Sequence, residues 1–157
     1  MKKIQAKTLS EFFGKNFPIA KLNNPALRKE IILISISLRK YGKEIDDETE
    51  ALRMKYVEGH EEEVEKWSKL IAEANAEKDE KKKAELFKKA EAMTEVAQIN
   101  REYIEALNAM LGEEMDCQVR KIDITDLIDA LTEVQMLTDT ASMESVIGEF
   151  EPILKDM

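Results

Sequence analysis

The sequence predicts a mainly α-helical fold: an elongated antiparallel helical bundle or coiled-coil hairpin, with a small two-stranded β element joining the N-terminal and C-terminal regions. Composition is the first reason, because 36% of the 157 residues are charged and only five glycines and three prolines could interrupt a helix. The second reason is that apolar residues recur at intervals of three and four, which keeps them on one side of a helix. We expect a single domain over residues 1–157, with three regions, 1–23, 24–112 and 113–157.

The region 1–23 is predicted to hold a strand, a short helix and an anchor loop. Residues 2–7 alternate weakly, as a short edge strand does. The stretch from Thr8 to Glu11 has the Ser/Thr-x-x-Glu form of a capping box, so a short helix should follow through Phe13. The residues expected to end that helix are Gly14, Asn16 and Pro18, and those expected to anchor the loop are Phe17, Ile19 and Leu22.

The long-helix bundle, 24–112, begins with the best-defined helix of the sequence, Asn24 to Glu58. Asn24 is a good N-cap, Pro25 suits the first helical position, and Gly59 suits a helix end. The seam that should face a partner consists of Leu27, Ile31, Ile34, Leu38, Tyr41 and Ile45. The apolar surface is widened by Ile32, Leu33 and Ile36, so we expect burial on more than one side of this helix.

Two further helices are expected in the same region. One carries Val64, Trp67, Leu70, Ile71 and Ala74, and a turn near Lys78 to Glu80 should follow it. The other runs without a break from Leu86 through Tyr103 to Met110, and Gly112 ends it.

The region 113–157 should contain a strand and short helices. Residues 115–123 place Met115, Cys117 and Val119 on one side, so a strand here could pair with residues 2–7. Thr125 is the expected N-cap of a helix that ends at Leu131 or as late as Leu137. A turn at residues 138–140 and a last short helix complete the chain; that helix holds Met143, Val146, Ile147 and Phe150 and stops at Pro152.

Charge is segregated along the chain, whose net charge is −9. Residues 1–45 carry ten Lys and Arg against three Asp and Glu, whereas residues 46–112 and 113–157 are both acidic. We expect the basic third to pack against the acidic remainder, in the same chain or in a neighbouring copy. Clustered Lys and Arg can also bind nucleic acid, but no interleaving of aromatic and basic residues accompanies them here.

No set of residues in the sequence has the spacing of a catalytic, cofactor or metal site. His60, the only histidine, could bind a metal together with Glu63. A di-iron bundle, however, needs such pairs on two helices, so we interpret this stretch as the solvent-exposed start of a helix. Cys117 has no partner thiol and no imidazole nearby in sequence, so we interpret it as a core residue and not as a nucleophile. The recurring carboxylates, Asp123, Asp126 and Asp129, lack the alternation and central glycine of a calcium loop.

The aromatic residues of the helices are Trp67, Tyr41, Tyr56 and Tyr103, and we expect them in a core, with a ligand stack as the alternative. A single cysteine excludes an internal disulfide, and no apolar run approaches the roughly 20 residues that cross a bilayer. The start of the sequence does not resemble a signal peptide. We therefore expect a cytoplasmic protein with no membrane association.

The order of these features resembles that of a group of small, uncharacterised helical proteins of phages and prophages. The resemblance lies in a long helix ending at Lys55-Tyr56, a leucine-rich helix from Leu107 to Leu111, the acidic corner Glu113-Glu114 and a Val/Ile-rich strand from Val119 to Ile122. The charged middle, residues 61–83, is longer than in that group. The resemblance implies an accessory role in virion assembly or host interaction, without catalysis, and it transfers no site residues.

The sequence thus predicts a non-enzymatic protein-interaction or structural accessory protein that binds protein partners or itself, with no cofactor. The alternative is a nucleic-acid-related protein, which either binds DNA through its basic third or imitates DNA with its acidic remainder. An enzyme with a carboxylate-only site is the third hypothesis.

Overall fold

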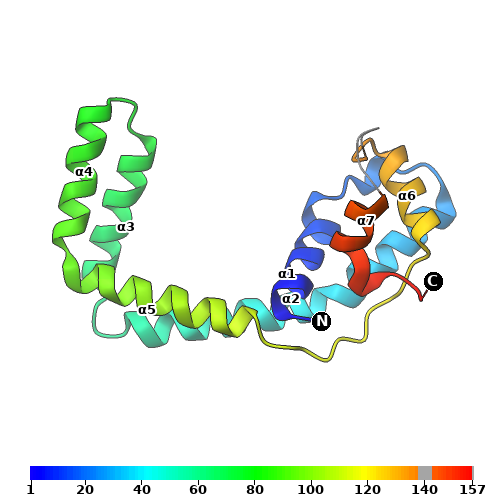
Figure 1. Cartoon of the computed structure of the whole chain (residues 1–157), viewed down its shortest axis with the longest axis horizontal. Helices are drawn as coiled ribbons and strands as arrows, with labels where there is room; N and C mark the ends of the chain where they lie inside the picture. The colour runs from blue at the N-terminus through cyan, green and yellow to red at the C-terminus, as the bar shows by residue number, and fades with distance from the viewer. Residues whose placement is uncertain (138–142, 157) are drawn as a thin grey trace. The chain divides into compact units, whose positions relative to one another are not determined.

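The computed structural model describes residues 1–137 and 143–156, and it shows a mainly helical chain that divides into two compact units (Figure 1). Unit 1 comprises Met1–Asp46 and Leu111–Met157, and unit 2 comprises Asp47–Met110. The long helix α2, Pro25–Val57, contributes its first part to unit 1 and its last part to unit 2. In the described residues, no helix is long and apolar enough to cross a membrane.

Unit 1 begins with a helix, α1 (Lys3–Glu11), so the N-terminal strand predicted at residues 2–7 is wrong. Ala6, Leu9 and Phe13 are buried at helical spacing, and this periodicity outweighs a weak alternation over six residues. The start is capped by Gln5, whose Oε1 accepts a hydrogen bond from the backbone N–H of Lys2 at 2.9 Å. The capping box predicted at Thr8 is therefore wrong too, because Thr8 lies inside the helix.

A single π-helical turn, η1 (Phe12–Asn16), continues α1, and a 3₁₀ turn, η2 (Ile19–Lys21), follows it. The π turn is closed by a hydrogen bond from the N–H of Phe17 to the carbonyl of Phe12, at 2.7 Å. Phe13 and Phe17 are buried in the core, whereas Gly14 and Lys15 are exposed. Leu22 is fully buried, and its carbonyl accepts a hydrogen bond from Arg28 Nε at 2.9 Å. The loop after η1 is thus anchored as the sequence predicts.

Helix α2 begins and ends where the sequence predicts. Asn24 Oδ1 accepts hydrogen bonds from the backbone N–H groups of Ala26 and Leu27, at 3.0 and 3.3 Å, and Gly59 adopts a φ of 83° after the helix. The seam residues that are buried in unit 1 are Leu27, Ile31, Ile34, Leu38 and Ile45. Burial on a second side is wrong for Ile32 and Ile36, which are 43% and 55% exposed.

Residues 113–123 form an extended segment that lies along α2, and the strand predicted there is wrong. Among the described residues only isolated bridges occur, Lys2 with Glu114 and Ile122 with Leu154. The backbone N–H groups of Gln118 and Arg120 instead donate to side chains of α2, Tyr41 Oη at 2.8 Å and Ser37 Oγ at 3.0 Å. The N-terminal and C-terminal regions still meet, because the N–H of Lys3 donates to the carbonyl of Glu113 at 3.0 Å.

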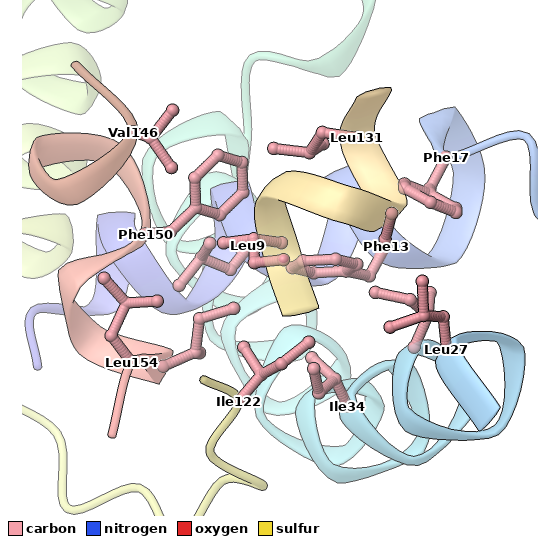
Figure 2. Close-up of a cluster of buried hydrophobic side chains, with 14 of the residues drawn as sticks. Leu9, Phe13, Phe17, Leu27, Ile34, Ile122, Leu131, Val146, Phe150 and Leu154 are labelled. Atoms are coloured by element: carbon pink, nitrogen blue, oxygen red, sulfur yellow. The ribbon is translucent and has the colours of Figure 1, made fainter. Parts of the chain in front are cut away.

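The core of unit 1 is closed by helices α6 (Ile124–Glu133) and α7 (Met143–Phe150) and the 3₁₀ turn η3 (Glu151–Ile153). Helix α6 starts after Asp123, not after the predicted cap Thr125, and the predicted turn at 138–140 lies outside the described residues. Figure 2 shows side chains from α1, α2, α6, α7 and the extended segment meeting in one apolar cluster. Phe150 lies 5.2 Å from Phe12 and 6.0 Å from Phe13, between ring centroids.

Unit 2 holds the end of α2 together with helices α3 (Glu61–Ala76), α4 (Glu80–Ala92) and α5 (Thr94–Leu111). Helices α3 and α4 pack side by side as a hairpin, joined at residues 77–79 close to the predicted turn (Figure 1). The unbroken helix predicted from Leu86 to Met110 is wrong, because Met93 leaves the helical conformation (φ −82°, ψ 63°) and separates α4 from α5.

Candidate functional site

Unit 2 leaves most of its apolar side chains partly exposed. Within residues 47–110, all of which the structure describes, the buried hydrophobic residues are Ala74, Ala90 and Val96. Unit 1, in contrast, buries a cluster of large Leu, Ile and Phe side chains. A domain of about 60 residues is marginally stable even with a well-filled core. Unit 2 therefore has apolar surface that a further protein surface could cover.

Unit 2 contains a groove between the end of α2 and the start of α3, which we call the α2/α3 groove. Its volume is about 860 Å³. The apolar residues that line it are Ala51, Met54, Val57 and Val64. Met54 is 61% exposed and is the most exposed large hydrophobic side chain in the described chain. Helix α2 contributes residues 51, 53, 54, 55 and 57, and Glu58 follows its end. Helix α3 contributes residues 61, 64, 65 and 68, which share one face of that helix.

An aromatic hollow of about 170 Å³ lies between α2, α3 and α5. Trp67 and Tyr103 line it together with Val57, Val96 and Ile99. The ring of Tyr103 also lies 6.3 Å from that of Tyr56, between centroids. The predicted core position of these aromatic residues is right only in part, because Trp67, Tyr56 and Tyr103 are each half-buried. The hollow contains no cluster of titratable groups that would indicate catalysis.

Charge on the α3–α4 hairpin is polarised between its two ends. The end near the start of α3, here called the base, carries Glu58, Glu61, Glu62, Glu63 and Glu65. The opposite end, here called the tip, carries Lys78, Lys81, Lys82 and Lys83 against Glu77, Asp79 and Glu80, so residues 77–83 have a net charge of +1. Asp79 caps α4 by accepting from the N–H groups of Lys81 and Lys82, at 2.9 and 3.2 Å.

The three lysines at the start of α4 are electrostatically misplaced. The N-terminus of a helix carries a partial positive charge, which favours Asp and Glu there and disfavours Lys. In the described part of the chain, none of the ammonium groups of Lys81, Lys82 and Lys83 pairs with a carboxylate. The base has the favourable arrangement, because Glu61, Glu62 and Glu63 lie in the first turn of α3. An acidic surface brought against the tip would therefore stabilise it.

His60 and Glu63 do not come together as ligands. His60 instead lies beside Glu95 of α5, with Nδ1 and Oε1 3.8 Å apart, a contact that is an ion pair only when the imidazole is protonated. Among residues 1–137 and 143–156, no three His, Cys, Asp or Glu side chains are grouped so that they could hold a metal ion. Asp123 pairs instead with Lys155, at 2.7 Å between Oδ2 and Nζ, which joins the extended segment to the C-terminal end of the chain.

Cys117 lies half-buried on the extended segment. Burial raises the pKa of its thiol, and the neighbouring carboxylates of Asp116 and Glu44 act in the same direction. A raised pKa keeps the sulfur protonated at neutral pH, which makes it a poor nucleophile. Tyr41 has a structural role, because its hydroxyl accepts a hydrogen bond from the backbone N–H of Gln118.

Part of the basic N-terminal third is neutralised inside unit 1. Lys3 Nζ lies 2.9 Å from Glu113 Oε2, and the N-terminal amine lies 3.5 Å from Glu114 Oε2. Lys7 pairs with Asp46 and Glu11. These ion pairs agree with the expectation that the basic third packs against acidic residues.

No protein-family model, curated protein or solved structure matches this chain. Sequence reasoning missed the α2/α3 groove, because spacing shows which residues share a helix face but not whether another helix covers that face. A signal was present in the thinning of the α2 seam after Ile45, where only Leu52 and Tyr56 continue it.

Proposed function

We propose that this chain is a non-enzymatic protein-interaction protein that associates with a second copy of itself through unit 2. The observation that carries the proposal is the near absence of buried large side chains in residues 47–110, together with a groove of about 860 Å³ that is lined by both apolar and charged side chains. Exposed apolar surface bordered by charged residues is typical of protein-binding sites. A second copy would supply the cover that unit 2 lacks.

Charge complementarity supports a second copy as the occupant. Helix α3 has 16 residues, so the tip and the base of one hairpin are about 24 Å apart. This separation is about three Debye lengths at physiological salt, where the Debye length is about 8 Å, so the two ends of one hairpin barely attract each other. An antiparallel, two-fold pairing places each basic tip on the acidic base of the other copy. The hairpin would then be a short coiled-coil element of a homo-oligomer.

A charge-swap experiment tests this arrangement. Replacing Lys81, Lys82 and Lys83 by Glu should strengthen α4 within each chain, because acids suit a helix start, but it should weaken self-association. Glu62→Lys/Glu63→Lys should weaken self-association as well. Mixing the two variants should restore it, since each altered end then meets an end of opposite charge. The measurement is the mass of each sample by sedimentation equilibrium, with helicity followed by circular dichroism.

The matched control is Lys88→Glu/Lys89→Glu, which also reverses charge on α4 but away from the tip. This control should not weaken association, because in the antiparallel pairing the region meets a basic tip. Unchanged mass in all the variants, or no recovery on mixing, would contradict the antiparallel arrangement.

We also propose, from the resemblance given above, that the protein acts in the cytoplasm as an accessory in a phage or prophage setting. The neighbouring genes test this part: genes for tail, portal or capsid proteins would support it, and a metabolic operon would contradict it.

The second candidate is binding to nucleic acid, favoured by the exposed cations of α2 in unit 1, Lys29, Arg39, Lys40 and Lys43. Affinity for duplex DNA that falls steeply with added salt would support this candidate. Repeating the DNA titration with a chain that is altered only in unit 2 distinguishes nucleic-acid binding from self-association.

A further inference from the structure

Unit 1 contains a cation-lined hollow that self-association does not use. It lies between α1, η1 and α2, has a volume of about 250 Å³, and is here called the α1/α2 groove. Its lining residues include Ser10, Gly14, Lys15, Ser35, Arg39 and Lys43. All of them belong to unit 1, so the groove is formed within one unit.

Close helix packing and the π turn shape this groove. At Gly42, an added Cβ would lie 2.4 Å from Ser10 Oγ, so only glycine allows α1 and α2 to approach as they do. Further along, the π turn places Gly14 opposite Ser35, where an added Cβ would be 4.0 Å from Ser35 Oγ. The groove stays open there because Gly14 has no side chain to fill it. Single π turns of this kind frequently occur at functional sites.

Some of the charged groups around the groove already form ion pairs, and others do not. Lys7 is held by Asp46 and Glu11, and the hydrogen bond to Asp46 raises its pKa. The two acids of the groove are therefore already neutralised in part by Lys7.

The other three cationic side chains of the groove form no ion pair with the described residues. In the described part of the chain, Lys15, Arg39 and Lys43 have no carboxylate partner. The half-buried hydroxyls of Ser10 and Ser35 likewise make no hydrogen bond to described residues. The groove thus gathers positive charge and free hydrogen-bond donors in one hollow.

We propose that the α1/α2 groove binds the phosphoryl group of a small phosphorylated molecule. An Arg guanidinium can donate two parallel hydrogen bonds to phosphate oxygens, Lys ammonium groups add point charges, and serine hydroxyls complete the coordination. The volume is below the roughly 300–1,000 Å³ of sites for drug-sized ligands, so the groove fits a phosphomonoester or a phosphorylated headgroup, not a whole nucleotide.

Titration of the full chain with inorganic phosphate and with glycerol phosphate, followed by calorimetry, tests the proposal. Arg39→Gln should weaken binding by about ten- to hundredfold, because hydrogen bonds to charged groups contribute that much. Gly14→Leu should weaken it similarly without any change in charge, since the new side chain fills the groove. Lys40→Gln is the matched control: it removes a cation from the same helix, one residue from Arg39 but outside the groove, and should leave affinity unchanged.

Vesicles of phosphatidylcholine with and without phosphatidic acid identify the source of the phosphoryl group. Binding of the soluble phosphates assigns a free small molecule, and binding only of the phosphatidic acid vesicles, lost in Arg39→Gln, assigns a lipid headgroup. The proposal is overturned if no probe binds, if Lys40→Gln weakens binding as much as Arg39→Gln, or if equal concentrations of chloride compete fully. Binding of duplex DNA alone, without the soluble phosphates, would overturn it as well. Because the groove lies in unit 1, these results do not depend on self-association.

Discussion

At the scale of single residues, three side chains of α2 hold the extended segment in place. Tyr41 and Ser37 accept backbone N–H groups of that segment, and Glu30 accepts two hydrogen bonds from the guanidinium of Arg120, at 3.1 and 2.8 Å. The backbone donors are thus satisfied by a helix instead of a second strand. Such pairing has no short-range sequence signature, so the alternation of residues 115–119 alone could not show it.

The pair of Glu30 and Arg120 predicts a dependence of stability on pH. The hydrogen bond from Arg120 lowers the pKa of Glu30 below its usual 4.5. A carboxyl group with a lowered pKa in the folded state stabilises the fold above its unfolded pKa, and this contribution is lost as the pH falls through the folded pKa. Glu30→Gln should therefore melt below the parent at neutral pH, and the difference should shrink below pH 4.5. A constant difference in melting temperature down to acidic pH would show that the charge of Glu30 is not involved.

Gly42 offers a second prediction at this scale. Gly42→Ala should destabilise unit 1 by about 1–3 kcal/mol, because the new methyl group overlaps Ser10. Gly148→Ala in α7 is the control: nothing lies within 4 Å of its Cβ position, so the higher helix propensity of Ala should stabilise the fold by about 0.5–1 kcal/mol. Ser10→Gly combined with Gly42→Ala should recover part of the loss. Denaturant unfolding measures all four proteins, and a stabilising Gly42→Ala would refute the close approach.

At the scale of helices, prediction succeeded where caps and periodicity agree. Asn24, Pro25 and Gly59 bound α2 as predicted, and the seam from Leu27 to Ile45 is buried. It failed at α1, where six residues are too few to separate period two from period 3.6. It failed again at Met93, since the apolar spacing runs through the break between α4 and α5. Neither glycine nor proline marks that break, so the usual helix-stop signals do not locate it.

The phase of α2 is tested by comparing two isoleucines of the same helix. Ile34 is fully buried, so Ile34→Ala should lower the free energy of unfolding by about 2–5 kcal/mol through lost contacts and a cavity. Ile36 is 55% exposed, and Ile36→Ala should change it by less than about 0.5 kcal/mol. Chemical denaturation with matched circular dichroism measures both. Equal effects at the two positions would mean that the helix is rotated from the orientation described.

At the scale of the whole molecule, the helical class followed from composition, but the division into two units did not. Apolar spacing is similar in the two units, whereas burial differs: unit 1 buries large side chains such as those of Ile31, Ile34 and Leu38, and the buried hydrophobic residues of unit 2 are Ala74, Ala90 and Val96. What covers a helix face depends on contacts distant in sequence. The exposed groove of unit 2 is for this reason visible only in the structure, and we propose that a second copy occupies it.

The direct test of self-association through unit 2 is sedimentation equilibrium of the full chain over a wide concentration range. Two variants of α2 are measured in the same way. The parent should show a mass that rises with concentration to that of a dimer or a larger oligomer. Met54→Lys should remain a monomer with unchanged helicity, because the lysine ammonium would have to lose its water for a second copy to cover the α2/α3 groove. Ile36→Lys, which alters a similarly exposed residue in unit 1, should associate as the parent does. A parent that is monomeric at every concentration, or a Met54→Lys variant that associates like the parent, would contradict self-association through unit 2.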